Sequence, residues 1–268
     1  MTRVAAVTGG VGAIGSAITA ALRTSGHAVA ILDRPVDPPN QSDAPPIDPP
    51  GRPDAPPVDP SHQSAAPPVD PAGRDADLPV DLTDRAAVAA AAAALLARHG
   101  RCDVLVHAAA AFDRASLADL DLPTWRRVQA VNVESALWLA QALTPGMAER
   151  RFGRIVFVVS DTVWDPPAAD LLAYVASKAA LIGMARTLAR SLGRDGITVN
   201  CVAPGLTPTP AAVASTPPEA FAAVRSRQAI DRDLAPGDVA AAVAFLVSEA
   251  AGAITGQTLC TDGGLILR

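Results

Sequence analysis

The chain alternates short apolar runs with longer stretches in which apolar residues recur every three or four positions. Arg3–Val7 and Ala28–Leu32 are apolar runs of strand length. Gly12–Thr24, which follows a glycine turn between them, has the apolar spacing of a helix. A strand, a glycine turn, a helix and a second strand form a βαβ unit, and such units build parallel sheets.

The same alternation resumes beyond residue 79, and a Pro-rich loop is expected from Pro204 to about Pro236. Strand ends or strands are predicted at Val80–Leu82, Val104–Ala108, Ile155–Val159, Ile197–Val202 and Gln257–Cys260, and helices at Arg85–Arg98, Thr124–Leu143, Ala173–Leu192 and Val239–Val247. The pattern predicts an α/β Rossmann fold: a doubly wound, seven-stranded parallel sheet with helices on both faces, in a single domain over residues 1–268.

Residues 35–79 interrupt this pattern and hold most of the prolines of the chain. An 11-residue repeat carries paired prolines in the copies that begin at Ala44, Ala55 and Ala66. Paired prolines exclude a helix, so we expect an exposed, mobile insertion with local polyproline II structure. Its role stays open between a repeat-expanded loop without function, a docking segment for a partner and a flap over the adenosine end of a cofactor.

Composition narrows the function classes. The formal net charge is −5, and the chain has no Lys/Arg run, which argues against nucleic-acid binding. No uncharged apolar run reaches the roughly 18 residues that a membrane span needs, and the N-terminus lacks the shape of a secretory signal. Cys102, Cys201 and Cys260 are far apart and in no metal-ligand spacing. We therefore expect a cytoplasmic protein with no membrane, nucleic-acid or metal partner.

The glycine turn predicts a dinucleotide site. Gly10-x-Gly12-x-x-Gly15 joins the first strand to the first helix, where a pyrophosphate is able to approach the helix N-terminus closely. Asp33 ends the second strand, where a carboxylate accepts hydrogen bonds from ribose hydroxyls and repels a 2′-phosphate. Arg34 favours the opposite choice, but the glycine turn carries no basic residue, so NAD is predicted over NADP.

The chain has one tyrosine, Tyr174, and one lysine, Lys178, and they lie four residues apart. On a helix this spacing places both on one face, where a cation favours the phenolate of a group with an ordinary pKa of ~10. Ser160 follows the predicted strand Ile155–Val159, at the edge where doubly wound sheets bind ligands. The three side chains are suited to acid–base chemistry on an alcohol or a carbonyl.

These motifs resemble those of the short-chain dehydrogenase/reductase family over nearly the whole chain, apart from the Pro-rich insertion. The matches are Thr8-Gly9 to Ile14-Gly15, with Ala13 where the middle glycine is usual, and Tyr174-x-x-x-Lys178, with Ser160 fourteen residues earlier. Further similar positions are Asn132, Asp81, Pro204-Gly205 with Thr209, Thr255-Gly256-Gln257 and Asp262-Gly263-Gly264.

The resemblance implies a catalytic set of Asn132, Ser160, Tyr174 and Lys178. Ser160 would hold the substrate oxygen, Tyr174 would exchange its proton, Lys178 would lower the tyrosine pKa and bind the nicotinamide ribose, and the backbone of Asn132 would seat a relay water. Cofactor contacts are expected from Gly9, Val11, Gly12, Ile14, Gly15, Asp33, Arg34, Asp81, Leu82, Ala108, Ala109, Ala110, Tyr174, Lys178, Pro204, Gly205, Leu206 and Thr209. The substrate pocket is expected from Ser160, Trp164, Tyr174 and Leu206, under a flexible lid at Leu206–Ile230.

One motif departs from the family pattern. Where the family usually has Asn-Asn-Ala-Gly, this chain has His107 followed by Ala108-Ala109-Ala110. His107 is either a general base or a histidine whose hydrogen bonds are satisfied within the sheet, and we favour the second interpretation.

We expect an NAD-dependent oxidoreductase that transfers hydride between nicotinamide and an uncharged secondary alcohol or ketone, including aryl and cyclic compounds. A 3-oxoacyl-thioester (acyl carrier protein) reductase is the alternative, kept open by Arg126, Arg127, Arg150 and Arg151. A catalytically silent NAD-binding sensor or scaffold is the alternative outside the enzymes. The resemblance also implies a homotetramer.

Overall fold

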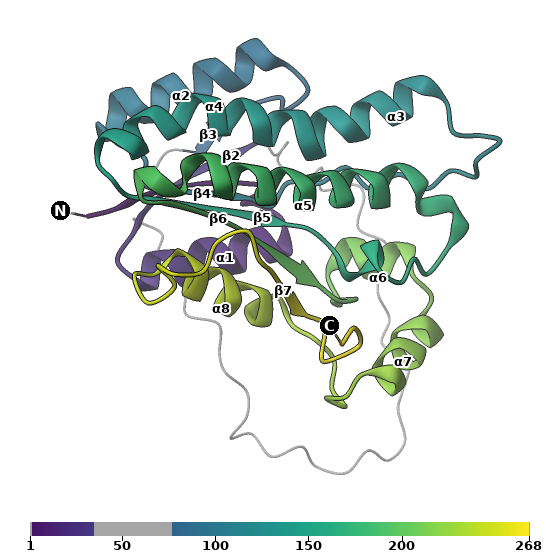
Figure 1. Ribbon diagram of the computed structural model, residues 1–268. Coiled ribbons are helices and arrows are strands. Elements are labelled where there is room, and N and C mark those ends of the chain that lie inside the picture. Colours follow the sequence, from purple (N-terminus) through teal and green to yellow (C-terminus); the bar gives the residue numbers. More distant parts are fainter. Residues whose placement is uncertain (1, 35–76, 268) are drawn as a thin grey trace, which may run out of the picture. The chain divides into compact units, whose positions relative to one another are not determined.

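The computed structural model describes residues 2–34 and 77–267, in which seven parallel strands form one sheet of order β3-β2-β1-β4-β5-β6-β7 (Figure 1). The strands are β1 Val4–Thr8, β2 Ala28–Asp33, β3 Asp77–Pro79, β4 Val104–His107, β5 Gly153–Val158, β6 Ile197–Pro204 and β7 Thr258–Thr261. The strand order reverses direction at β1 and β4, which is where doubly wound sheets form their binding crevice. The predicted parallel sheet is confirmed.

Strand β3 begins earlier than the sequence pattern predicts. Asp77–Pro79 was assigned to the end of the Pro-rich insertion, with a strand end at Val80–Leu82. Instead, Asp77, Leu78 and Pro79 pair with Ile31, Leu32 and Asp33 of β2. Pro79 is tolerated because β3 is an edge strand and pairs on one side only. The remainder of the predicted insertion, up to residue 76, lies outside the described residues.

Helices cover both faces of the sheet (Figure 1). One face packs under α2 (Arg85–His99), α4 (Ser135–Glu149) and α5 (Leu172–Leu192), and the other under α1 (Ala13–Thr24) and α8 (Pro236–Val247). The two faces follow from the alternation of side chains along each strand. In β1, Val4 and Ala6 join the first core, whereas Ala5 and Val7 join the second. The inner strands are therefore apolar at most positions, as parallel strands buried on both faces require.

The long helix predicted at Thr124–Leu143 is three consecutive elements. Helix α3 (Leu122–Gln129) runs through a π-helical turn, η2 (Ala130–Glu134), into α4. A π turn inserts one residue into the helical hydrogen-bond ladder and frees backbone groups to bind elsewhere, and such turns are frequent at functional sites. The residue types do not predict this π turn, because the apolar spacing of the helix continues through it. Asn132 lies at its centre.

The Pro-rich loop predicted from Pro204 to about Pro236 contains two short helices, α6 (Pro210–Ser215) and α7 (Pro218–Arg227). Both begin at prolines, whose missing N–H costs nothing in the first turn. Thr209 caps α6 through its hydroxyl, which accepts a hydrogen bond from the Ala212 amide. Pro210 and Pro218, two of the prolines that suggested a loop, are helix starts, so this prediction was wrong in detail.

The helical stretch Ala169–Asp195 is long and apolar enough to cross a membrane by length and composition alone. Helix α5, which makes up most of it, packs against β6 and buries Lys178 and Leu181. Core helices of sheet proteins pass the same test, so the stretch is accounted for by the fold.

Candidate active site

The carboxyl ends of the central strands bring the predicted motifs together. β1 leads into the glycine loop, β4 into Ala108 and β5 into Ser160, while β6 ends at Pro204. A cavity of about 460 Å³ opens over this edge. Ten of the predicted residues line it: Ile14, Ala108, Ala110, Ser160, Tyr174, Lys178, Pro204, Gly205, Leu206 and Thr209. Predicted cofactor contacts and catalytic side chains therefore share one space.

The glycine loop packs too tightly for larger residues. Gly9 has a φ of +68°, and a Cβ there would lie 2.6 Å from the amide nitrogen of Ala109. A Cβ on Gly15 would lie 2.0 Å from the carbonyl oxygen of Gly9. Helix α1 then starts after Gly12, with no side-chain cap and no acidic residue in its first turn. Its first amides are therefore available to an anion.

Asp33 lies next to this loop. Its carboxylate accepts hydrogen bonds from the Val11 amide at 3.1 Å and from the Arg34 amide at 2.8 Å. Asp81 is exposed and accepts from the Thr83 amide and hydroxyl, which lower the pKa of its carboxyl, as does the nearby charge of Arg34. Leu82 is buried in the core rather than on the cavity surface.

Tyr174, Lys178 and Ser160 meet on the cavity floor. Lys178 Nζ lies 5.6 Å from the centre of the Tyr174 ring and donates to the Val158 carbonyl at 2.8 Å. The hydroxyl of Ser160 is close enough to the Tyr174 phenol to lower its pKa. The predicted spacing on α5 therefore places the phenol and the amine on one face, opposite the end of β5.

Burial dominates the titration of both groups. It raises the pKa of Tyr174 to about 12, against a lowering by the hydrogen bond with Ser160 and a further raising by the charge of Asp161. Burial also lowers the pKa of Lys178 to about 8. A bound cation near the phenol would oppose the effect of burial on Tyr174.

Asn132 supports the site from behind. Its side-chain amide donates to the Ala111 carbonyl at 3.1 Å and to Ser177 Oγ at 2.8 Å, and its Oδ1 accepts from the Ala111 amide at 2.7 Å. Ser177 in turn donates to the Tyr174 carbonyl at 2.6 Å. Asn132 is fully buried and lies outside the cavity lining, so its side chain acts on the framework that holds Tyr174.

Both ring nitrogens of His107 have hydrogen-bond partners within the fold, in agreement with the interpretation favoured from the sequence. Its ring is buried, with Nδ1 2.9 Å from Thr8 Oγ1 and Nε2 3.1 Å from the Asn132 carbonyl oxygen. Burial, together with the charge of Lys178, lowers its pKa to about 3. The ring does not reach the cavity lining.

Asp161 is a site residue that the motifs did not reveal. It lines the cavity beside Ser160, whose hydroxyl donates to Asp161 Oδ1 at 3.3 Å and accepts from Thr162 Oγ1 at 3.0 Å. Burial raises the pKa of Asp161 to about 6, helped by the charge of Asp262. Its position directly after Ser160 was the signal that could have found it.

The substrate side of the cavity is mostly apolar. Phe112 is 45% exposed and packs edge-on against Tyr174, with ring centres 4.8 Å apart. Trp164, predicted to line this pocket, instead packs against the hydrophobic core and is not part of the lining. The short turn Asp161–Val163 after Ser160 places Trp164 against the core. Other apolar residues of the lining are Pro167, Leu171, Leu206, Pro217, Val224 and Leu265.

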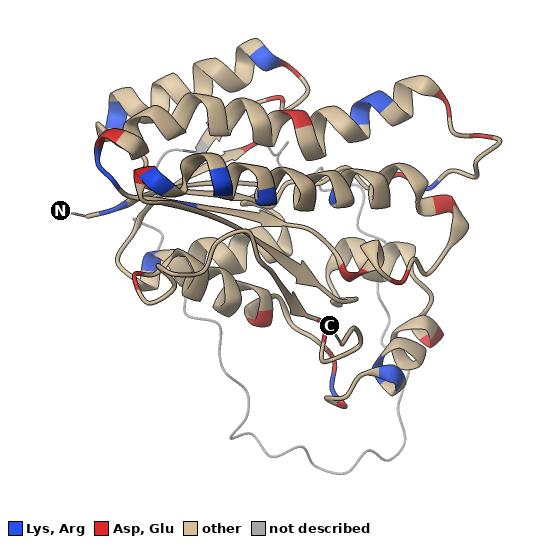
Figure 2. Ribbon diagram, viewed as in Figure 1, with Lys and Arg blue, Asp and Glu red and all other residues tan. Residues whose placement is uncertain are grey.

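The two arginines of the lining are ion-paired. Arg114 contacts Asp170 at 2.9 Å, and Arg227 of α7 contacts Asp165 at 2.5 Å. Figure 2 shows that most charged residues of the described part lie on helices and loops rather than on the strands. The cavity rim therefore offers compensated charge instead of an open basic surface. No group of described His, Cys, Asp or Glu residues is arranged to hold a metal ion.

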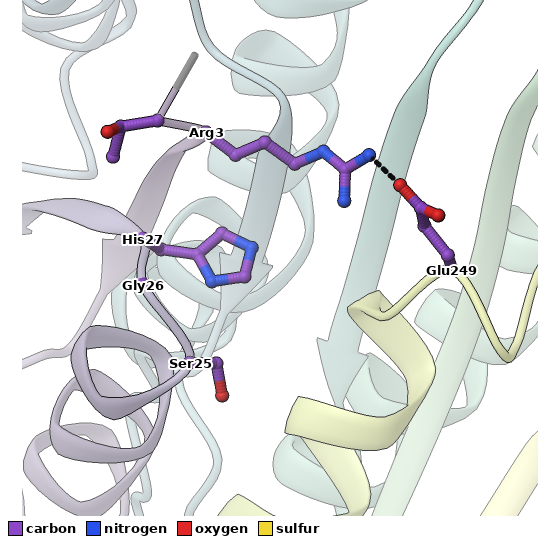
Figure 3. Close-up of a pocket in the computed structure, with 6 residues that line it drawn as sticks. Arg3, Ser25, Gly26, His27 and Glu249 are labelled. Atoms are coloured by element: carbon purple, nitrogen blue, oxygen red, sulfur yellow. Dashed lines mark hydrogen bonds and ion pairs between the residues drawn. The ribbon is translucent and has the colours of Figure 1, made fainter.

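A second hollow of about 330 Å³ is lined by Thr2, Arg3, Ser25, Gly26, His27 and Glu249 (Figure 3). Arg3 and Glu249 form an ion pair across it. Arg3 and His27 flank the amino ends of β1 and β2, the edge of the sheet opposite to the catalytic side chains. It holds none of the predicted site residues.

Comparisons with known proteins agree with this geometry. A family model described as enoyl-(acyl carrier protein) reductase matches residues 58–266. The chain belongs to the short-chain dehydrogenase/reductase family, and it is an oxidoreductase that acts on a CH–OH group or a carbonyl. Enzymes of this family typically use a nicotinamide cofactor.

Curated relatives include D-xylose 1-dehydrogenase of Caulobacter vibrioides, which is 37% identical over 64% of this chain and 68% of its own length. Acetoacetyl-CoA reductase of an Acinetobacter species is 34% identical over 69% and 74%. Cis-4-hydroxycyclohexanecarboxylate dehydrogenase of Sinomonas cyclohexanicum is 36% identical over 68% and 73%. A solved Serratia marcescens short-chain dehydrogenase/reductase has a TM-score of 0.78 at 27% identity, covering 98% of this chain and 97% of the other. The likeness therefore extends over the whole fold, while the relatives differ in substrate.

Proposed function

We propose that this chain is an NAD-dependent dehydrogenase that transfers hydride between the nicotinamide and an uncharged secondary alcohol or ketone. The observation that carries the proposal is the single cavity in which Ser160, Tyr174 and Lys178 meet the residues after β1, β4 and β6. The uncapped start of α1 and the glycine loop fit a pyrophosphate. When bound, the dinucleotide supplies the hydride chemistry and, in its oxidised form, a positive charge near the phenol.

The chain's own groups handle the proton. Ser160 binds the substrate oxygen, and Tyr174 takes the alcohol proton during oxidation or returns it during reduction. Lys178 is buried beside the ring and stabilises the phenolate while binding the ribose. The network of Asn132, Ser177 and Ala111 holds the Tyr174 backbone in place.

Asp33 supports NAD as the cofactor. Its carboxylate lies at the end of β2 and already binds the Val11 amide of the glycine loop, so it faces the region where the ribose hydroxyls of the adenosine would lie. A 2′-phosphate there would be repelled by this charge. Arg34 is exposed next to it and is the group that would otherwise favour NADP.

The lining supports an apolar substrate, aryl or cyclic compounds included. Phe112 presents a half-exposed ring beside Tyr174, where it is able to stack on a substrate ring. Arg114 and Arg227 are neutralised by their aspartate partners, so neither is free to bind a substrate anion. The cavity volume of about 460 Å³ suits a compact molecule.

A 3-oxoacyl-thioester reductase is the second candidate, supported by the description of the family model and by the acetoacetyl-CoA reductase relative. The basic residues that would attract an acidic carrier weaken it. Arg127 pairs with Asp113, Arg150 with Asp103 and Arg151 with Asp195. Three of the four arginines considered for docking therefore have partners within the chain.

The test follows NADH and NADPH absorbance with aryl ketones, cyclic ketones and acetoacetyl thioesters, and follows NAD and NADP reduction with the corresponding alcohols. Turnover of an aryl or cyclic compound with the NAD pair supports the proposal. Preference for acetoacetyl thioesters with NADPH supports the second candidate. A folded protein that binds NADH without turning over any compound favours the sensor or scaffold. Light scattering tests the homotetramer that belongs to this proposal, and fractionation of source cells tests the cytoplasmic location.

A further inference from the structure

His107 ends β4 in the position where the family usually has asparagine, and its side chain is completely buried between β1 and η2. No step of the proposed reaction uses it. A buried imidazole costs free energy unless both ring nitrogens find partners, so its two hydrogen bonds require an explanation.

The partners allow a single proton arrangement. The Asn132 carbonyl, 3.1 Å from Nε2, only accepts hydrogen bonds, so Nε2 carries the proton. Nδ1 of the neutral ring then accepts from the hydroxyl of Thr8 at 2.9 Å. The Thr8 oxygen in turn accepts from the Ala109 amide at 3.2 Å. These three hydrogen bonds form a chain from the Ala109 amide through Thr8 and His107 to the π turn, and each donor in it has an acceptor.

The row joins two halves of the site. Thr8 is the last residue of β1, directly before the glycine loop that packs against Ala109. Asn132 lies in the π turn, with its side chain bound to Ser177 below Tyr174. His107 therefore connects the cofactor loop to the backbone that supports the catalytic tyrosine, and it does so through one rigid ring.

We propose that His107 is a positioning residue that acts as a neutral Nε2–H donor, holding the Asn132 carbonyl with one nitrogen and Thr8 with the other. It occupies one of the two lone pairs of that carbonyl, so a relay water on Asn132 has only the second one to use. Its effect on turnover rests on the proposed function, whereas its tautomer and its effect on cofactor binding do not.

The surroundings keep the ring neutral. The Lys178 amine of α5 acts on the ring through its charge. The edge of Phe157 from β5 lies with ring centres 6.5 Å apart, and the Thr8 hydroxyl of β1 and the Asn132 carbonyl of η2 are the hydrogen-bond partners. No carboxylate is among the groups that shift it. Burial and the lysine charge both oppose protonation, and the pKa falls to about 3.

The first experiment records long-range ¹H–¹⁵N spectra of the whole chain with labelled histidine between pH 5 and 9. His107 is identified by the signal that disappears in His107→Gln. We expect the Nε2–H tautomer with no titration over this range. The Nδ1–H tautomer, or a midpoint near the ordinary 6.5, would overturn the proposal.

The second experiment separates the two nitrogens by substitution. The amide of His107→Asn reaches the position of Nδ1 and retains a partner for Thr8, whereas the amide of His107→Gln reaches the position of Nε2 and retains a donor for Asn132. We expect roughly a tenfold loss of kcat in the first variant with little change in the KM for NAD. The second should show roughly a tenfold rise in the KM for NAD with little change in kcat. A purely structural role would move both constants alike in both variants, and that result would overturn the proposal.

His107→Phe removes both hydrogen bonds and should combine the two losses. If this variant does not fold, as judged by its thermal transition, His107→Asn and His107→Gln still test the proposal. If the wild-type chain shows no turnover, the proposed function fails. A fluorescence titration with NADH still measures the effect of the hydrogen bond between His107 and Thr8 on cofactor affinity. Unchanged NADH affinity in His107→Gln would then count against the inference itself.

Discussion

The Lys178 amine lies 5.6 Å from the centre of the Tyr174 ring and donates at 2.8 Å to the backbone carbonyl of Val158. The amine is thus held by the last residue of β5, while the ring is carried by α5. The separation of the amine and the phenol ring is set by the packing of a helix on a sheet rather than by a direct bond between them. Burial of both groups makes their titration sensitive to any charge that enters the cavity.

Tyr174→Phe should abolish turnover, with a loss of roughly 10³-fold or more, because it removes the group that exchanges the substrate proton. The ring and its contact with Phe112 remain in this variant. The affinity for NADH should therefore change by no more than about twofold, as for a substitution that removes no packing contact. Steady-state kinetics and NADH fluorescence titration measure the two quantities. Retained activity would contradict the acid–base role.

The phenol itself can be titrated directly, because the chain has one tyrosine. Burial raises the pKa of Tyr174 to about 12, so phenolate absorbance should be absent at pH 10, where an exposed tyrosine is half ionised. Saturating NAD should move the midpoint to lower pH, since its positive charge favours the phenolate. NADH, which lacks that charge on the ring, is the control and should move the midpoint less.

Asp161→Asn should lower the pKa of Tyr174, because the carboxylate opposes the phenolate. It should also stabilise the chain. Folding raises the pKa of Asp161 from 3.8 to about 6, so the native state binds this proton more tightly than the unfolded state does. The stabilisation that the bound proton gives to the native state is lost as the pH rises through about 6. The ionised group then costs at most about 3 kcal/mol above pH 6, from two pKa units at 1.36 kcal/mol each.

Thermal unfolding of this variant should therefore show a larger gain at pH 8 than at pH 5. Asp170→Asn, whose carboxylate pairs with Arg114 of the same cavity lining, is the matched control. An equal gain at both pH values would contradict the raised pKa of Asp161.

Asp33→Ala should relax the cofactor preference toward NADP. The change removes the repulsion of a 2′-phosphate and leaves Arg34 to attract it, so the ratio of kcat/KM for NAD over NADP should fall by roughly 10- to 100-fold, about 1.4 to 2.8 kcal/mol. The double variant with Arg34→Ala is the control, in which the gain for NADP should be lost. An unchanged ratio would show that Asp33 does not discriminate between the cofactors.

Phe112→Ala should raise the KM for aryl ketones by roughly tenfold, because an aromatic contact of about 1 kcal/mol and its buried area are lost. The KM for small aliphatic ketones should change much less. Trp164→Ala is the informative comparison, since Trp164 packs on the core and should affect thermal stability rather than KM. Equal effects on aryl and aliphatic substrates would exclude stacking on Phe112.

Much of the fold was predictable because its signal is local and repeated. β1, α1 and β2 were placed within one residue by apolar runs and a glycine turn. The predicted start of α2 also matches its cap, since the Asp84 carboxylate accepts a hydrogen bond from the Ala86 amide. The π turn at 130–134 was not predictable, since it depends on tertiary hydrogen bonds of Asn132 rather than on residue types.

The site divides in the same way. Ser160, Tyr174 and Lys178 carry a spacing motif, and the structure brings them to one cavity. Phe112 and Asp161 carry none, because a substrate-facing role depends on which way a loop turns after its strand. Trp164 was predicted to line the cavity because it lies near the motif in the sequence, but its side chain packs on the core. Spacing along the chain identified three residues that line one cavity, but only the loop geometry separates residues of the lining from residues of the core.

The short β3 strand has a consequence for the behaviour of the protein in concentrated solution. At an open sheet margin, unpaired backbone groups invite strands from other molecules, which is a route to aggregation. Here that margin is three residues long and ends in Pro79, which has no N–H to offer. In the part of the chain that the structure describes, the β3 margin is therefore poorly suited to strand addition, and we expect replacement of Pro79 by valine to raise the tendency of the chain to self-associate.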